Sequence, residues 1–199
     1  VLEYMHGGSL HDLLHNRTHA CEGDEETPLP IAARLLSRIS LEVATGVAYL
    51  HDSGVIHRDV KAANVLLDEK QHAKVTDFGI STNFGVEHTA ETGTYRSMAP
   101  EVISHQKYDY KCDVYSFGVL LWEIVHQQIP FEEDNALQAA FAVAMEEKRP
   151  CINPRPDLET FGELISACWA QSPTTRPDMD LVVRRLIALD AQVGRAGAP

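Results

Sequence analysis

The sequence has 199 residues, 44% of them hydrophobic, which is enough to bury one sizeable core and suggests one or at most two domains. Its formal net charge of −12 at pH 7 would repel nucleic acid and anionic membrane surfaces, and we find no basic stripe to offset it. Its apolar runs are far shorter than the ~20 residues that a membrane-spanning helix needs, so we expect neither a nucleic-acid partner nor a membrane.

The N-terminal part of the chain is predicted to contain two helices joined by a surface loop. A short helix is expected over residues 9–15, followed by a polar, acidic and proline-bounded loop from Asn16 to Pro30. From Ile31 to Leu50 apolar residues recur in steps of four, which predicts a long amphipathic helix. Gly54 supplies a helix stop.

A small hairpin and an irregular loop are expected next. Two short apolar runs, residues 64–67 and 73–75, are separated by four polar residues and indicate two antiparallel strands. The segment from Ser81 to Thr94 is polar, contains five Ser and Thr residues and has no periodicity. We expect it to form a mobile loop.

The C-terminal half is predicted to be helical. Apolar residues occupy nearly every position from 113 to 125, as in a helix that is buried on most sides. Three further helices are expected over residues 135–147, 159–170 and 179–191, with a frayed tail over 191–199. Together these elements predict an α+β fold that is mainly helical and carries one small β-hairpin.

Residues 57–64, His-Arg-Asp-Val-Lys-Ala-Ala-Asn, place an acid, a cation and an amide on one loop directly before the first predicted strand. Phosphoryl transfer from ATP requires groups that orient a hydroxyl, neutralise the γ-phosphate and hold Mg²⁺, which prefers oxygen ligands. Asp59, Lys61 and Asn64 can supply these three functions.

A second motif, Asp77-Phe78-Gly79, begins thirteen residues after Asn64 and follows the second predicted strand. It places a carboxylate beside a large apolar anchor, where the carboxylate can reach the same metal ions. Together with residues 57–64 and the later Ala-Pro-Glu at 99–101, it resembles the catalytic signature set of eukaryotic protein kinases. The resemblance covers about residues 1–190 and implies a protein kinase-like fold, with helices around one buried central helix.

The resemblance implies a catalytic role for four of these residues. Asp59 would accept or orient the proton of the substrate hydroxyl, and Lys61 would contact the transferred phosphoryl group. Asn64 and Asp77 would bind the two Mg²⁺ ions. The implied cofactors are ATP and Mg²⁺, and the implied partners are protein substrates with Ser or Thr acceptors.

The resemblance also implies structural roles for five residues. Glu101 would pair with Arg176, and Asp113 would be a buried acid that braces the catalytic loop. His57 and Phe78 would likewise be structural members of their motifs.

A regulatory role is implied for the catalytic loop as well. Arg58 would pair with a phosphate on the activation loop, for which Thr89 and Thr92 are our candidate sites.

The start of the chain resembles the hinge of a kinase domain. Backbone groups of Glu3 and Met5 would read the adenine ring, Leu66 would form the floor beneath it, and Lys61 would complete the nucleotide contacts. Residues 1–8 are therefore expected to be a hinge remnant, and residues 9–190 the C-terminal lobe.

The position of Lys61, together with Gly-Thr-Tyr-Arg at 93–96, favours Ser/Thr over Tyr specificity. Residues 93–101, 113–118 and 168–169 are similar to the tyrosine-kinase-like group of Ser/Thr kinases, in which dual specificity stays open.

The sequence contains no Gly-x-Gly-x-x-Gly loop and no Val-Ala-x-Lys strand, which belong to the N-terminal lobe of such kinases. We expect this lobe to be absent from the chain. Because those groups align the phosphates of ATP, and positioning dominates phosphoryl transfer, we expect residues 1–199 alone to be inactive.

Two other function classes fit part of the sequence. The first is a pseudokinase or kinase-fold scaffold that binds protein partners, although every catalytic position in the chain is intact. The second is a small-molecule phosphotransferase, which typically lacks the Ala-Pro-Glu segment. We prefer a protein Ser/Thr kinase to both.

Three histidines, His11, His15 and His19, are spaced four residues apart and would line up on a helix to bind a metal. Because Pro28 and the acidic loop argue against a long helix there, we favour a solvated surface.

The four cysteines, Cys21, Cys112, Cys151 and Cys168, are widely spaced and form no Cys-x-x-Cys pair. This pattern argues against a zinc site and a disulfide framework and favours a reducing, cytoplasmic (intracellular) setting. Cys112 and Cys168 lie in apolar helical patterns and are expected in the core.

Overall fold

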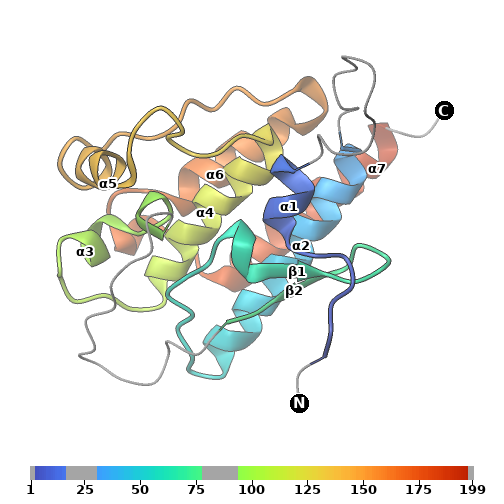
Figure 1. Ribbon diagram of the computed structural model, residues 1–199, viewed down its shortest axis with the longest axis horizontal. Coiled ribbons are helices and arrows are strands. Elements are labelled where there is room, and N and C mark those ends of the chain that lie inside the picture. Colours follow the sequence, from blue (N-terminus) through green and yellow to red (C-terminus); the bar gives the residue numbers. More distant parts are fainter. Residues whose placement is uncertain (1–2, 17–30, 78–93, 197–199) are drawn as a thin grey trace.

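The computed structural model describes residues 3–16, 31–77 and 94–196 (Figure 1). The α-helices are α1 (Leu10–His15), α2 (Ala33–Asp52), α3 (Pro100–Ile103), α4 (Lys111–His126), α5 (Ala136–Met145), α6 (Gly162–Cys168) and α7 (Met179–Ala196). The strands are β1 (Val65–Leu67) and β2 (Ala73–Val75), and the short 3-10 helices are η2 (Ala62–Asn64), η3 (Thr94–Arg96), η4 (Pro156–Phe161) and η5 (Pro173–Thr175). The described chain is thus mainly helical with one small sheet, which confirms the predicted fold class.

Helix α4 forms the centre of the molecule. All its residues from Cys112 to Val125 are buried, because the sequence is apolar on every face of the helix. It packs against α2 and α6, and in Figure 1 it lies in the middle of the helical body. Two acids, Asp113 and Glu123, are buried along with its apolar residues.

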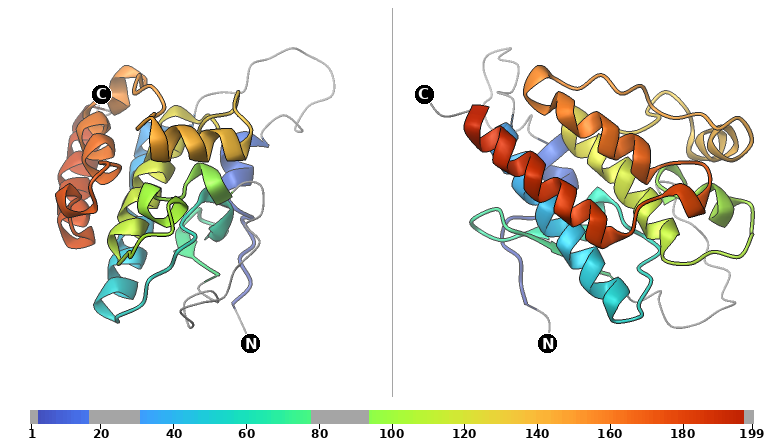
Figure 2. Two further views of the ribbon diagram at one scale, coloured as in Figure 1. Left: turned by 90° about the vertical axis from the view of Figure 1, so that its left-hand side faces the viewer. Right: turned by 180° about the vertical axis from the view of Figure 1, so that it is seen from behind.

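Helix α7 packs along α2 (Figure 2). The helix continues through residues 191–196, which we had expected to fray, so that part of the prediction is wrong. The physical reason is that the apolar stripe of α7 extends beyond residue 191, since Val193 is 8% exposed and belongs to the core with Val182 and Leu186.

The predicted hairpin is present. Strands β1 and β2 are antiparallel, with Val65 opposite Val75. The carboxylate of Asp68 closes the turn, since its Oδ1 accepts hydrogen bonds from the backbone N–H of Lys70 and His72, both at 2.8 Å. The hairpin lies against α2.

The segment before α1 runs beside the hairpin. The N–H of Gly7 donates to the carbonyl of Leu67 at 2.8 Å, and the N–H of Leu67 donates to the carbonyl of Gly8 at 2.9 Å. A Cβ at Gly7 would lie 2.6 Å from the backbone oxygen of Asp68, so the close approach requires glycine. The segment that we expected to be a hinge is therefore attached to β1.

The helix predicted over residues 159–170 is shorter in the structure. The 3-10 helix η4 precedes it, and α6 spans only Gly162–Cys168. In the described residues, none of the helices is both long enough and apolar enough to cross a bilayer.

Candidate active site

The loop between α2 and η2 is held by one buried carboxylate. Asp113, at the start of α4, is fully buried, and it accepts hydrogen bonds from the backbone N–H groups of His57 and Arg58, each at 2.7 Å. Arg58 has a φ of 70°, a left-handed conformation that non-glycine residues rarely adopt. The two charge-assisted bonds offset the strain of this conformation. They also fix the direction of the backbone that continues from Arg58 to Asp59.

The imidazole of His57 joins the loop to the hairpin. Its Nδ1 accepts a hydrogen bond from the backbone N–H of Asp59 at 3.2 Å, so Nε2 carries the proton that is donated to the carbonyl oxygen of Thr76 at 2.9 Å. The His57 side chain is fully buried. It thereby sets the position of Asp59 relative to the end of β2.

Three of the predicted catalytic residues are in direct contact. The Nζ of Lys61 lies 2.8 Å from Oδ2 of Asp59, and the amide nitrogen of Asn64 donates to the same Oδ2 at 2.8 Å. Asn64 also donates to the backbone carbonyl of Asp59 at 2.8 Å. The other carboxylate oxygen of Asp59, Oδ1, is buried and has no hydrogen-bond partner among the described residues. One oxygen is therefore oriented by two donors, and the second is left without a hydrogen-bond partner among the described residues.

Asp77 lies at the same end of the hairpin as Asn64. The hydrogen bond from Thr76 N–H to the carbonyl of Asn64, at 2.9 Å, brings the two ends together. Asp77 is solvent-exposed and has a φ of 64°. Within the described residues, no hydrogen bond or ion pair joins its carboxylate to Asp59 or Asn64. Phe78 lies outside the described residues.

The side chains at this end of the hairpin suit a hard cation such as Mg²⁺. Asn64 uses its amide nitrogen in both of its bonds to Asp59, which leaves its amide oxygen as the atom for a cation. The exposed carboxylate of Asp77 is also an oxygen donor, the ligand type that Mg²⁺ prefers. The donor set therefore fits the metal that the sequence implied.

The predicted nucleotide-binding residues lie on two adjoining segments. Leu66 forms an isolated antiparallel bridge with Ser9, and it is half-buried, as is Met5. The exposed side chain of Glu3 pairs with Lys74 on β2, with 2.5 Å between Oε2 and Nζ. These contacts place the start of the described chain beside the hairpin that carries Leu66.

Arg176 and Glu101 form a buried charge pair. Both guanidinium Nη atoms of Arg176 bond the Glu101 carboxylate, at 2.6 and 2.8 Å, as expected from the sequence. Arg176 is 2% exposed and also donates to the carbonyls of Ala170, Lys111 and Gln171. The pair thus joins α3 to the N-terminal end of α4.

Of the three residues predicted to be regulatory, the structure describes only Arg58. The guanidinium of Arg58 lies over the ring of Tyr108, 5.6 Å from its centroid. Thr89 and Thr92, the candidate phosphorylation sites, lie outside the described residues.

Two contacts were not predicted from the sequence. His51, in the last turn of α2, places Nε2 2.9 Å from Oδ2 of Asp113 and belongs to no motif that would have indicated it. His15, which we expected on a solvated surface, is bonded to the buried Glu123 at 2.8 Å, so that interpretation is wrong for this residue. His19 lies outside the described residues. The spacing of the histidines indicated a shared face but not the acid that faces it.

A family model and similar individual proteins identify the same class of protein. A family model described as protein tyrosine and serine/threonine kinase matches residues 1–186. The serine/threonine-protein kinase STY46 of Arabidopsis thaliana is 40% identical over 200 residues, which are 99% of this chain and 33% of that protein.

Two further relatives are similar over most of the chain. The serine/threonine/tyrosine-protein kinase HT1 of Arabidopsis thaliana is 38% identical over 100% of this chain and 49% of its own length. The putative mitogen-activated protein kinase kinase kinase 7-like of Drosophila melanogaster is 37% identical over 90% of this chain and 45% of its own length. The chain therefore spans between a third and a half of the length of these relatives.

Proposed function

The chain belongs to the protein tyrosine and serine/threonine kinase family, and we propose that the whole protein transfers the γ-phosphate of ATP to Ser or Thr hydroxyls of protein substrates. The resemblance to Ser/Thr kinases of the tyrosine-kinase-like group is confirmed by the family match and by relatives such as STY46 and HT1.

The carboxylate of Asp59 is the observation that carries this proposal. Its Oδ2 is oriented by Lys61 and Asn64, while Oδ1 has no hydrogen-bond partner among the described residues. A carboxylate held in this way can accept the hydrogen bond of a substrate hydroxyl through Oδ1. It can then take the proton as that hydroxyl attacks the γ-phosphate.

Lys61 and the two metal-binding candidates complete the proposed site. Lys61 carries positive charge next to Asp59 and would neutralise the phosphoryl group as it moves. Asn64, through its amide oxygen, and Asp77, through its carboxylate, would hold Mg²⁺. When bound, the metal supplies positive charge that stabilises the phosphate oxygens during transfer.

The nucleotide and regulatory roles are part of the same proposal. Glu3 and Met5 would contact adenine through their backbone, Leu66 would lie beneath the ring, and Arg58 would pair with a phosphate on Thr89 or Thr92. The attachment of the N-terminal segment to β1 supports the first of these roles, since it brings together the two segments that we propose to contact adenine.

We further propose that residues 1–199 alone do not catalyse transfer. Nothing in this sequence matches the Gly-rich loop or the Val-Ala-x-Lys strand that hold the phosphates of ATP in line in kinases. Incubation of this segment with ATP, Mg²⁺ and a generic Ser/Thr substrate should yield no phosphate transfer, whereas the whole protein should transfer it. Transfer by the segment at the rate of the whole protein would contradict the proposal.

Substitution of the proposed base tests the function directly. In the whole protein, Asp59→Asn should lower phosphate transfer to a Ser/Thr substrate by at least about 100-fold, because the amide cannot accept the proton. Nucleotide binding, measured by fluorescence of a labelled ATP analogue, should be largely retained.

The matched control is Asp190→Asn on α7, which removes the same charge from a helix that carries none of the proposed catalytic residues and should leave transfer unchanged. Near-normal turnover of Asp59→Asn would refute the assignment. If the wild-type protein transfers no phosphate but binds protein partners, the scaffold function replaces it.

Phosphoamino-acid analysis of the product identifies the type of residue that accepts the phosphate. The printed name of the relative HT1 includes tyrosine, so dual specificity is the alternative for this site. Phosphoserine and phosphothreonine are the expected products, and phosphotyrosine alone would contradict the proposed specificity.

A further inference from the structure

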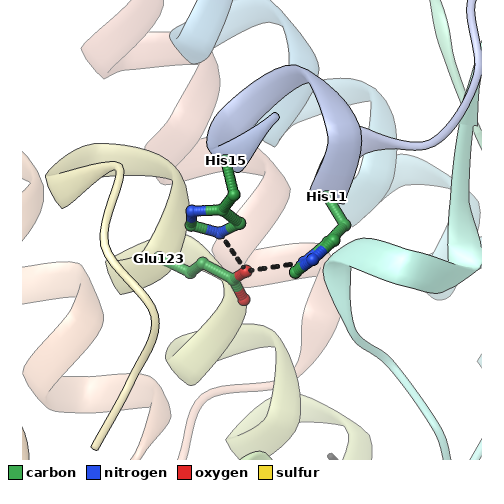
Figure 3. A group of neighbouring side chains, drawn as sticks. All are labelled: His11, His15 and Glu123. Atoms are coloured by element: carbon green, nitrogen blue, oxygen red, sulfur yellow. Dashed lines mark hydrogen bonds and ion pairs between the residues drawn. The ribbon is translucent and has the colours of Figure 1, made fainter. Parts of the chain in front are cut away.

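Helices α1 and α4 bring two histidines and one acid together (Figure 3). His11 and His15 are one turn apart on α1, and both point toward Glu123 of α4 (Figure 3). Nε2 of His15 lies 2.8 Å from Oε1 of Glu123, and Nδ1 of His11 lies 3.9 Å from the same oxygen. One ligand atom from each residue lies within 4.8 Å of the others.

Two side chains of the cluster are largely shielded from solvent, and the third is partly exposed. The side chains of His15 and Glu123 are each 11% exposed, whereas that of His11 is 42% exposed. An ion could therefore enter past His11 and would meet a carboxylate that is already held in place by His15. In the described parts of the chain, no other three His, Cys, Asp or Glu side chains meet in this way.

We propose that His11, His15 and Glu123 bind a zinc ion, with water as the fourth ligand. Two imidazole nitrogens and one carboxylate oxygen are a ligand set that zinc takes in proteins, with bond lengths of about 2.0–2.2 Å. This proposal goes beyond phosphate transfer and does not depend on it, because none of the three residues belongs to the proposed catalytic site. None of the proposed ligands is a cysteine, so the cysteine spacing that argued against a zinc site does not count against this one.

The distances are compatible with a tetrahedral ion. Bonds of this length place neighbouring ligand atoms about 3.3 Å apart in a tetrahedron. The two measured separations, 2.8 Å from His15 and 3.9 Å from His11 to the Glu123 oxygen, lie on either side of that value. The three ligand atoms lie within 4.8 Å of one another, so side-chain shifts of up to about 1.5 Å would convert the hydrogen-bonded arrangement into a ligated one.

The ligand types select zinc over the metal of phosphate transfer. Mg²⁺ and Ca²⁺ prefer oxygen ligands, and Mg²⁺ keeps several of its waters. Imidazole suits zinc and other transition metals instead. The two metals would thus occupy separate sites, with Mg²⁺ at Asn64 and Asp77 and zinc between α1 and α4.

The zinc ion would attach a short helix to the centre of the molecule. Helix α1 has six residues, which is too short to be stable by itself. A capping box between Ser9 and Asp12 supports its first turn. Ligands on both α1 and α4 would fix this helix, and through it the segment that pairs with β1, to the buried core.

Zinc titration of the whole protein after treatment with a chelator tests the proposal. Calorimetry with zinc chloride should show a site of one ion per chain in the wild type. His11→Gln should weaken binding by about 100-fold or more, since it removes a ligand while the partly exposed position tolerates glutamine. His15→Gln should have a similar effect.

His72→Gln is the matched control. Its Nδ1 lies 2.6 Å from the Glu42 carboxylate, so the control disrupts a histidine–glutamate pair that has no third ligand among the residues the structure describes. Zinc affinity should change by less than about 2-fold in this variant, because no zinc ligand is lost. Circular dichroism checks that each variant is folded.

Cobalt substitution provides a second readout. Co²⁺ at a tetrahedral site of this kind absorbs in the visible range, and these bands should appear in the wild type and in His72→Gln but not in His11→Gln. The proposal is overturned if the wild type binds no zinc, or if His11→Gln and His15→Gln bind it as tightly as His72→Gln. Neither outcome would affect the phosphate-transfer proposal, which is measured with Mg²⁺ and a protein substrate.

Discussion

At the scale of single residues, Asp113 determines the shape of the loop that carries Asp59. A fully buried carboxylate is unfavourable unless donors surround it, and here the backbone N–H groups of His57 and Arg58 and the ring of His51 supply them. The same bonds hold Arg58 at a φ of 70°. Stability and the geometry of Asp59 therefore depend on one side chain that itself faces no substrate.

Asp113→Asn should destabilise the protein by about 2–4 kcal/mol, because an amide replaces one acceptor with a donor that faces other donors. Denaturant unfolding measures this change in the free energy of unfolding. The control Asp52→Asn alters an exposed residue at the end of α2 and should change stability by less than about 0.5 kcal/mol. Equal unfolding midpoints for the two variants would contradict the role given to Asp113.

The sequence predicted that the motif residues lie close together, but it did not predict the bonds between them. The spacing of Asp59, Lys61 and Asn64 indicated a common loop, and the structure places their side chains in contact. Which oxygen of Asp59 is left without a partner among the described residues depends on the fold around it. His51 lies in no motif and reaches Asp113 only because α2 packs against α4.

At the scale of elements, the contact between α4 and α6 depends on a glycine. A Cβ at Gly118 would lie 2.8 Å from the Cβ of Cys168 and 3.0 Å from the backbone nitrogen of Trp169. Neither atom is at the end of a flexible side chain, so neither can move away by a side-chain rotation. The two helices can therefore approach this closely only where no side chain stands between them.

Gly118→Ala should lower the free energy of unfolding by about 1–3 kcal/mol, because an extra methyl group overpacks this contact. Gly162→Ala is the control, since its Cβ would meet only the Cγ2 of Ile152 at 3.1 Å, a side-chain methyl group that can move. Thermal or denaturant unfolding of both variants measures the difference. A Gly162→Ala variant that is less stable than Gly118→Ala would contradict this packing.

Periodicity predicted the elements well where one face or all faces are apolar. The stripe on α2 and the continuous apolar run of α4 indicated both helices, and the hairpin followed from its two short runs. Element ends were less predictable. The tight 3-10 turn η4 replaces the first residues of a predicted helix, and burial of Val193 extends α7.

At the scale of the whole molecule, the core protects two thiols. Cys112 and Cys168 are buried, and Cys151 is exposed. Burial raises the pKa of Cys168 to about 12 and raises that of Cys112 well above its usual range. Both thiols therefore stay protonated and unreactive while the molecule is folded.

Iodoacetamide labelling of the native protein near pH 8 should modify Cys151 and leave Cys112 and Cys168 unlabelled. Denaturant should expose both buried thiols together, since they lie in one core around α4. Peptide mapping by mass spectrometry resolves each site. Labelling of Cys168 at the rate of Cys151 under native conditions would contradict the buried core.

The central claim is that Asp59 and Lys61 act as one phosphate-transfer unit, and a double-mutant cycle on the transfer step tests it most directly. Single-turnover transfer from ATP is measured in the whole protein for wild type, Asp59→Asn, Lys61→Ala and the double variant. Each single change should slow transfer by at least about 100-fold, and the double variant should be little slower than the worse single variant, because residues of one unit are not additive. Independent, multiplicative losses, or single variants with near-normal rates, would contradict the account.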